Sequence, residues 1–144
     1  MMSNQECAFC QADVESAPAR ERAHVTDYWR VTAHRSALPG WMLLMPRRHV
    51  ESLSELTAEE AAELGPLLRA ASIVQVQEFD ALKSYVMQFA EGVRHTHFSI
   101  APRRGDLPLE RVGAAVSAYN SQDEPISEAE RDELAIRIAS AWPV

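Results

Sequence analysis

The chain has 144 residues and a formal net charge of −7. This length suits one domain around one core, so we interpret residues 1–144 as a single domain. The acidic balance argues against a general nucleic-acid binder, which normally presents a basic face. It does not exclude a small anionic ligand, because a local pocket can oppose the overall charge.

The first residues do not have the pattern expected of a targeting signal. Residues 1–6 lack the basic and apolar regions of a signal peptide, and no apolar run approaches the roughly 20 residues that cross a bilayer. We therefore expect a cytoplasmic protein without a membrane partner. The two cysteines, Cys7 and Cys10, lie in an N-terminal arm over residues 1–12. In a reducing compartment such a pair indicates a metal or redox site rather than a structural disulfide.

The first half of the chain predicts strands. Residues 24–34 alternate loosely between apolar and polar and predict one or two strands. Pro39-Gly40 marks a turn. The apolar run 41–45 that follows predicts a short central strand, buried on both faces and ended by Pro46.

A long helix is predicted next. Thr57-Ala58-Glu59-Glu60 forms a capping box, and apolar residues then recur at helical spacing. Gly65-Pro66 lies inside this pattern, so Pro66 either sits within the helix or begins a second segment.

The second half of the chain alternates again between strands and helices. Residues 85–89 and 97–101 predict two strands, and residues 109–119 predict a helix. A second capping box at residues 127–130 predicts a terminal helix within a C-terminal extension over residues 120–144. Because the strand connections are short, we expect an α+β domain with helices packed on an antiparallel sheet.

The segment His95-Thr96-His97-Phe98-Ser99-Ile100 carries the clearest chemical signal. On a strand His95, His97 and Ser99 point to one face, while the intervening residues point to the core. A neutral imidazole is a competent nucleophile toward phosphorus. The alternative is that two histidines at alternate strand positions are surface or hydrogen-bonded residues without a catalytic role.

Residues 39–50 and 95–103 together resemble the histidine triad (HIT) family, and the likeness extends from Cys7 to about Arg103. The resemblance implies an α+β fold with a five-stranded antiparallel sheet. It also implies a homodimer formed through the long helix and an adjoining strand. Members of the family hydrolyse or transfer nucleoside monophosphate groups, so the expected partner is a small-molecule nucleotide.

The resemblance also assigns roles within the motif His-x-His-x-His. The middle histidine, here His97, is the nucleophile that attacks the α-phosphorus and forms a covalent nucleotidyl-histidine. The backbone carbonyl of His95 receives the Nδ1 proton of the nucleophile and fixes its tautomer. Ser99 stands at the third histidine position, where its hydroxyl can still donate to a phosphoryl oxygen.

Four further positions depart from the family pattern. Trp41 stands where many members have a fourth histidine, and Ala33 stands where an acidic or amide residue holds the ribose hydroxyls. Ala90 replaces an amide on the preceding strand, and the loop before the motif is shortened to residues 91–94. The nucleophile position is thus present, while much of the nucleotide-binding pocket differs.

Other side chains are candidates for the missing substrate contacts. Arg94 adjoins His95, and its guanidinium suits phosphate oxygens; the alternative is a solvated loop arginine. His34 follows the ribose position and is a second candidate, and Arg103 is a third. Trp41 could stack on a base, although a tryptophan beside an apolar strand is more often a core residue.

A structural zinc site is the expected cofactor site. Cys7 and Cys10 have the spacing of paired zinc ligands. The resemblance implies that His49 and His95 complete the set, as in bacterial members that bind zinc. The alternative is two free thiols on a mobile arm.

The leading hypothesis is a nucleotide hydrolase or nucleotidyl transferase that acts through His97 on dinucleoside polyphosphates or nucleoside phosphoramidates. The first alternative is a non-catalytic nucleotide-binding or regulatory protein that has lost most of the substrate contacts. The second is a zinc-stabilised interaction module with an empty pocket.

Overall fold

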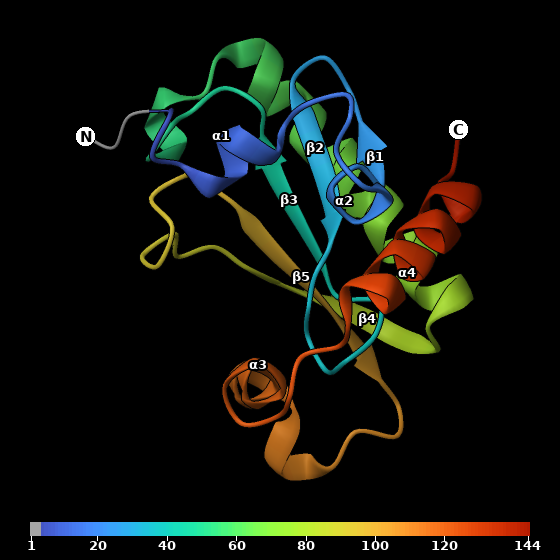
Figure 1. The fold of residues 1–144 in the computed structure, drawn as a ribbon. Helices are drawn as coiled ribbons and strands as arrows, with labels where there is room; N and C mark the ends of the chain where they lie inside the picture. The colour runs from blue at the N-terminus through green and yellow to red at the C-terminus, as the bar shows by residue number, and fades with distance from the viewer. Residues whose placement is uncertain (1–3) are drawn as a thin grey trace.

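A computed structural model describes residues 4–144 (Figure 1). The strands are β1 (His24–Val25), β2 (Trp29–Ala33), β3 (Met42–Pro46), β4 (Ala81–Met87) and β5 (Phe98–Arg104). The α-helices are α1 (Ala8–Ala12), α2 (Ala58–Glu78), α3 (Ala118–Ser121) and α4 (Glu128–Ala141). The 3₁₀ turns are η1 (Ala19–Glu21), η2 (Leu53–Glu55), η3 (Leu109–Arg111) and η4 (Gly113–Ser117).

The strands form one five-stranded sheet in the order β1-β2-β3-β5-β4, and every neighbouring pair is antiparallel. The predicted α+β class is therefore confirmed. Figure 1 shows α2 behind this sheet and α1 in front of it. The strand expected over residues 97–101 is β5, which begins at Phe98, so His97 lies directly before it. β5 lies between β3 and β4, so the motif is held near the centre of the sheet.

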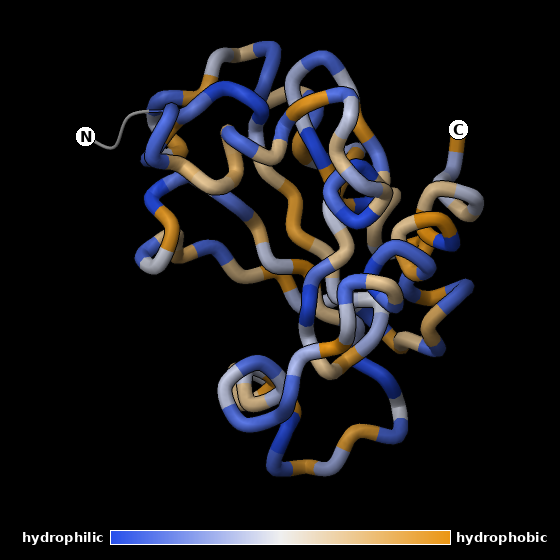
Figure 2. Tube along the Cα trace, in the orientation of Figure 1, coloured by the Kyte–Doolittle hydropathy of each residue, from blue (hydrophilic) through white to orange (hydrophobic). Residues whose placement is uncertain are grey.

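The core lies between the sheet and α2. Alternation along the strands turns Val31, Met42, Leu44 and Ile100 toward this side, where they are at most 1% exposed. Val74 of α2 packs into the same cluster. Figure 2 shows hydrophobic residues concentrated along the strands and the adjoining helices, with hydrophilic residues in most outer loops.

The long helix begins as predicted. The Thr57 side chain accepts the N–H of Glu60, and the Glu60 side chain accepts the N–H of Thr57. Such a reciprocal cap is worth about 1 kcal/mol. Pro66 lies within this helix and does not begin a second segment, because α2 continues through it.

Two predicted elements are wrong in their extent. The helix expected over residues 109–119 is divided into η3, η4 and the start of α3, and Gly113 interrupts it with a φ of +63°. The strand expected over residues 85–89 ends at Met87. Beyond it Phe89 is 77% exposed and Ala90 has a φ of +57°, so the chain leaves the sheet there.

The terminal helix α4 packs on η1 and on β2. Its N-cap is Ser127, whose side chain accepts the N–H of Glu130. Ala135 and Ile138 are buried in the core cluster. Within residues 4–144, no helix is both long enough and apolar enough to cross a membrane.

Candidate functional site

The face of the sheet opposite α2 carries a cleft of about 550 Å³. The registers of β2, β3 and β5 place Thr32, Leu43 and Ser99 side by side across its floor. Phe9 of α1 contributes to one wall. A smaller hollow of about 240 Å³ adjoins the cleft, and His97 and Ser99 line both spaces.

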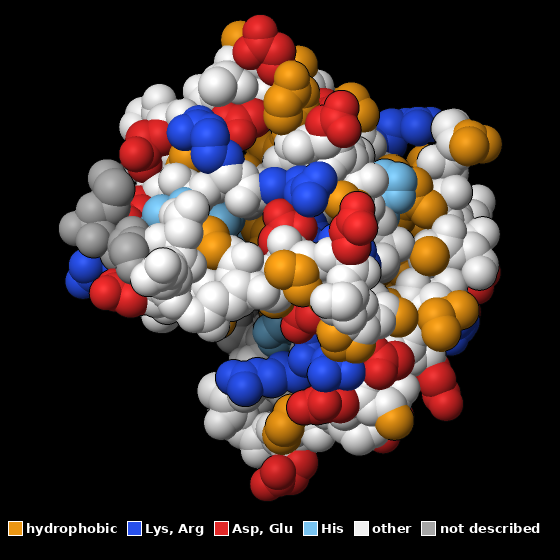
Figure 3. Space-filling view, turned by 45° about the horizontal axis from the view of Figure 1, so that its top comes forward, with side chains coloured by type: hydrophobic (Ala, Val, Ile, Leu, Met, Phe, Trp, Pro, Cys, Tyr) orange, Lys and Arg blue, Asp and Glu red, His pale blue; other side chains and the backbone are white. Residues whose placement is uncertain are grey.

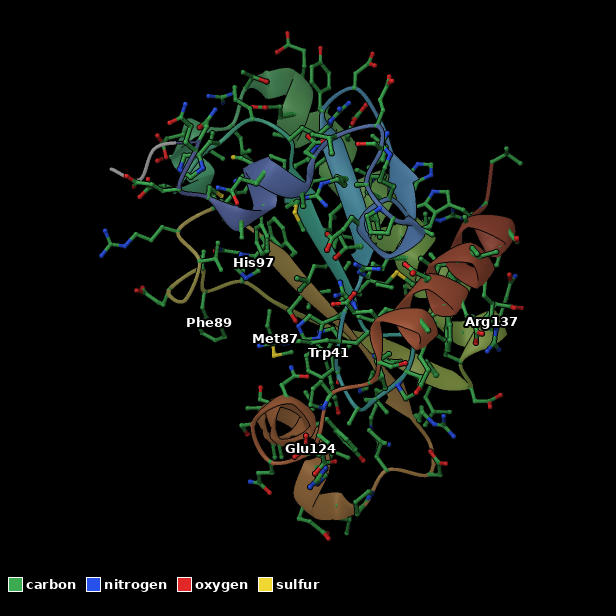
Figure 4. The ribbon with its side chains drawn as sticks, viewed as in Figure 1. Trp41, Met87, Phe89, His97, Glu124 and Arg137 are labelled. Carbon is green, nitrogen blue, oxygen red and sulfur yellow. The ribbon has the colours of Figure 1, made fainter. Side chains whose placement is uncertain are left out.

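His97 is held by the backbone of its own segment. Its Nδ1 lies 2.7 Å from the carbonyl oxygen of His95. A carbonyl only accepts, so Nδ1 is the donor and the lone pair of the neutral ring is on Nε2. The ring of Phe9 meets the ring of His97 edge-on at a centroid distance of 5.0 Å. Figure 4 shows His97 beside the start of β5, with Met87 and Trp41 further toward α3.

Ser99 is oriented by a neighbouring strand. The Nε1–H of Trp41 donates to the Ser99 hydroxyl oxygen at 2.5 Å. That oxygen acts as the acceptor, so the Ser99 hydroxyl hydrogen is available for a ligand in the cleft. Trp41 itself is 2% exposed and packs with Leu38 and Val116, although its edge reaches the smaller hollow.

His34 lines the cleft just beyond the end of β2. Burial, together with the positive charges of Arg131 and Arg35, lowers the pKa of His34 to about 4, so the ring is neutral at pH 7. Its Nδ1 accepts the N–H of Ser36 at 3.1 Å, which leaves the proton on Nε2. Ala33, at the expected ribose position, lies instead in the core cluster. The cleft-facing side chain at this end of β2 is therefore that of His34.

Among the cleft residues that the sequence reasoning missed are two arginines. Arg35 and Arg131 both line the cleft with His34. Arg35 could have been found by its position next to His34. Arg131 offered no local signal, because it reaches the cleft from α4, where its Nε donates to the carbonyl of Ala33, 98 residues away in sequence.

Arg94 and Arg103, which were candidates for substrate contacts, do not line the cleft. Arg94 is exposed and is not among the described residues that line the cleft or the hollow. Arg103 belongs to β5, where its guanidinium donates to the carbonyl of Arg104. The structure thus brings together His34, Trp41, His97 and Ser99, but not these two arginines. The side chain of His95, expected on the same face as His97, lines neither space and is 1% exposed.

A second cluster lies beside the motif and joins α1 to the sheet. One side-chain atom from each of Cys7, Cys10, His49 and His95 lies within 4.8 Å of the others. Sγ of Cys10 is 3.5 Å from Nδ1 of both histidines, and Sγ of Cys7 is 3.4 Å from Nδ1 of His95. Zinc bonds of 2.0–2.3 Å in a tetrahedron imply ligand separations of about 3.5 Å, so the four donors fit this metal.

The remaining ring nitrogens of the cluster are also satisfied. Nε2 of His95 donates to the carbonyl of Pro46 at 2.7 Å, and Nε2 of His49 lies 3.2 Å from Glu51. Such partners orient histidine ligands of metals. Burial and the neighbouring Cys7 raise the pKa of the Cys10 thiol to about 12, so a cation must displace a proton to bind.

Comparison with known proteins supports the fold. Neither a protein-family model nor a curated protein sequence matches the chain. Among solved structures, a zinc-bound histidine triad family protein of Mycobacterium smegmatis superposes with a TM-score of 0.67 and 16% identity over 96% of this chain and 94% of that chain. A histidine triad protein of Bradyrhizobium japonicum gives a TM-score of 0.68 and 19% identity over 85% and 90% of the two chains.

A diadenosine triphosphate hydrolase of Plasmodium falciparum is also similar, with a TM-score of 0.65 and 20% identity over 84% of this chain and 75% of that chain. The chain therefore has the fold of histidine triad proteins, as its two sequence segments indicated. One of the proteins with this fold, that of Plasmodium falciparum, is thus a hydrolase.

Proposed function

We propose that the protein hydrolyses or transfers nucleotidyl groups through a covalent intermediate on His97. The observation that carries this proposal is the 2.7 Å contact between His97 Nδ1 and the His95 carbonyl. It leaves Nε2 as the nucleophilic nitrogen at the junction of a cleft and a hollow.

In the proposed step, the Nε2 lone pair of His97 forms a bond to the α-phosphorus. The bond from phosphorus to the leaving group breaks, and the leaving group departs with that electron pair and takes up a proton from solvent water. Water or another acceptor then displaces the histidine and restores the neutral ring. The Ser99 hydroxyl donates to a non-bridging phosphoryl oxygen, where negative charge develops.

The two spaces beside His97 have different linings. We place the nucleoside in the larger cleft, against Phe9, and the leaving group in the smaller hollow. Among the described residues that line the hollow there is no lysine or arginine, whereas Glu91 is acidic and Met87 and Phe89 are apolar. This lining favours an amine leaving group, and hence a nucleoside phosphoramidate, over an anionic polyphosphate.

The test of this function is turnover combined with capture of the intermediate. The full chain is incubated with nucleoside phosphoramidates and with dinucleoside polyphosphates, quenched in base, and analysed for a nucleotidyl adduct by mass spectrometry. We expect turnover and an adduct on His97. His97→Asn should lose at least roughly a thousandfold in kcat/KM, as expected for removal of a nucleophile.

The control is His24→Asn, because His24 stacks on Trp142 with a centroid distance of 4.4 Å and does not line either space. It should retain full activity. Absence of turnover with both substrate classes, or full activity in His97→Asn, would contradict the proposal.

The second candidate is a non-catalytic nucleotide-binding protein. It is favoured by Trp41 and Ser99, which stand at two histidine positions of the family pattern and bond to each other. This function predicts nucleotide binding without turnover and without an adduct in the experiment above.

We also infer that Cys7, Cys10, His49 and His95 bind a structural zinc ion. The support is the donor set, its spacing and the second contacts of both rings. These residues would hold α1 against the motif. The bound ion would supply folding free energy and would take no part in the chemistry at phosphorus.

A further inference from the structure

The cleft has a positively charged end. Arg35 follows β2, and Arg131 lies in the first turns of α4. Both line the cleft that His97 lines. The bond from Arg131 Nε to the Ala33 carbonyl, 2.8 Å long, holds its guanidinium at the end of β2. Figure 3 looks into a hollow in which a histidine is visible beside Lys or Arg side chains.

This charge is only partly offset by nearby carboxylates. Asp123 lines an adjoining pocket together with Arg35, but it forms an ion pair with Arg111. Glu21 is the one carboxylate among the described residues that line the cleft. It lies 3.1 Å from Arg30 and 3.5 Å from Arg131, so it is shared between two guanidinium groups. No hydrogen bond or ion pair engages the guanidinium of Arg35 within residues 4–144. A region of net positive charge therefore occurs in a chain whose formal charge is −7.

His34 adds a third donor to this end of the cleft. Its Nδ1 accepts the N–H of Ser36, so Nε2 carries the proton of the neutral ring. The side chains here, His34, Arg35 and Arg131, thus present donors to a ligand. An unmodified sugar diol needs an acceptor for its hydroxyl hydrogens, and the carboxylate of Glu21 is already shared between Arg30 and Arg131. A phosphate offers only acceptors and carries the opposite charge.

We propose that the substrate is a nucleotide with a second phosphate on its sugar, which Arg35 and Arg131 bind while His97 attacks the 5′-phosphorus. This inference rests on the proposed function and specifies its substrate class. Arg35 and Arg131 are then specificity-determining residues that take the place of a ribose-binding carboxylate.

The test measures binding to the full chain by isothermal titration calorimetry. The ligands are the 5′-monophosphate, the 5′-diphosphate, the 2′,5′-bisphosphate and the 3′,5′-bisphosphate, each of adenosine and of guanosine. We expect one of the sugar bisphosphates to bind at least roughly tenfold more tightly than both the monophosphate and the diphosphate of the same base. Arg35→Gln and Arg131→Gln should each reduce this preference to less than about threefold.

Arg137→Gln is the matched control. Arg137 is also on α4, but it bonds to Glu78 and lies far from His97 (Figure 4). It should retain the preference. Arg131→Gln could unfold because its bond to Ala33 is lost. In that case Arg35→Gln alone tests the inference, since the Arg35 side chain is exposed and its substitution should not disturb the fold.

Three outcomes would overturn the inference. The first is equal binding, or no binding, of mono- and bisphosphates. The second is a preference that survives Arg35→Gln. The third is a 5′-diphosphate that binds as much more tightly than the monophosphate as the sugar bisphosphates do. That result would mean that the arginines bind the 5′-phosphate chain and not a phosphate on the sugar. Because these are binding measurements, they are separate from failure of the proposed function, which is absence of turnover and adduct.

Discussion

Single side chains set the charge state of the cleft, and His34 is the clearest case. A histidine has a pKa of 6.5 when unperturbed, whereas burial and two nearby arginines lower the pKa of His34 to about 4. Below pH 6.5 the unfolded chain therefore takes up a proton that the folded chain does not. Stability linked to His34 is fully present above pH 6.5 and is lost as the pH falls toward 4.

We expect His34→Gln to remove part of this acid sensitivity. At about 1.4 kcal/mol per pKa unit, the free energy of unfolding of the wild type should fall by about 2–3 kcal/mol more than that of the variant between pH 7 and pH 4. Urea denaturation at both pH values measures the difference. His24 and His95, whose pKa values are also lowered by burial, are the same in both proteins. Parallel pH profiles would show that His34 is not buried in its neutral form.

At the level of elements, α1 depends on its contacts with the rest of the chain. It has five residues and no side-chain cap, and a helix this short is unstable alone. Cys7 and Cys10 at its start join it to His49 and His95, and Phe9 then lies against His97. The proposed zinc site would therefore stabilise both the fold and one wall of the cleft.

This role predicts one zinc ion per chain by metal analysis and a lower melting temperature after chelation. Cys10→Ser should lose the metal and at least about 2 kcal/mol, or roughly 6–8 °C. As the internal control, a chelator should not lower the melting temperature of Cys10→Ser any further. Purified wild type without metal, or with unchanged melting after chelation, would argue for two free thiols.

At the scale of the whole molecule, the outer strand and the long helix leave apolar side chains exposed. Leu82 and Val86 on the edge strand β4 are 70% and 47% exposed, and Val76 on α2 is 48% exposed. An exposed apolar edge strand favours pairing with another chain. This is the surface through which the sequence resemblance predicts a homodimer.

We expect the wild type to sediment as a dimer in analytical ultracentrifugation and Val86→Arg to sediment as a monomer, because the substitution places charge on the edge strand. Val14→Arg is the control: Val14 is 47% exposed and follows α1, on the side of the sheet opposite α2, and its substitution should leave the dimer intact (Figure 1). A monomeric wild type would contradict the expectation.

Much of the fold could be predicted because its determinants are local. The capping box at Thr57 begins α2, and the turn at Pro39-Gly40 precedes β3, because both depend on residues that are near in sequence. The region over residues 109–119 was harder, since a single residue, Gly113, divides it into short turns.

By itself, the sequence determined that His97 and Ser99 share a face. Side chains two residues apart point the same way in an extended segment, so this result needs no information from the rest of the chain. It also determined the spacing of Cys7 and Cys10. Only the tertiary structure decided that His34 rather than Ala33 faces the cleft, and that Arg131 reaches it from α4. Such contacts join segments distant in sequence, and their positions follow from the packing of the whole domain rather than from any local pattern.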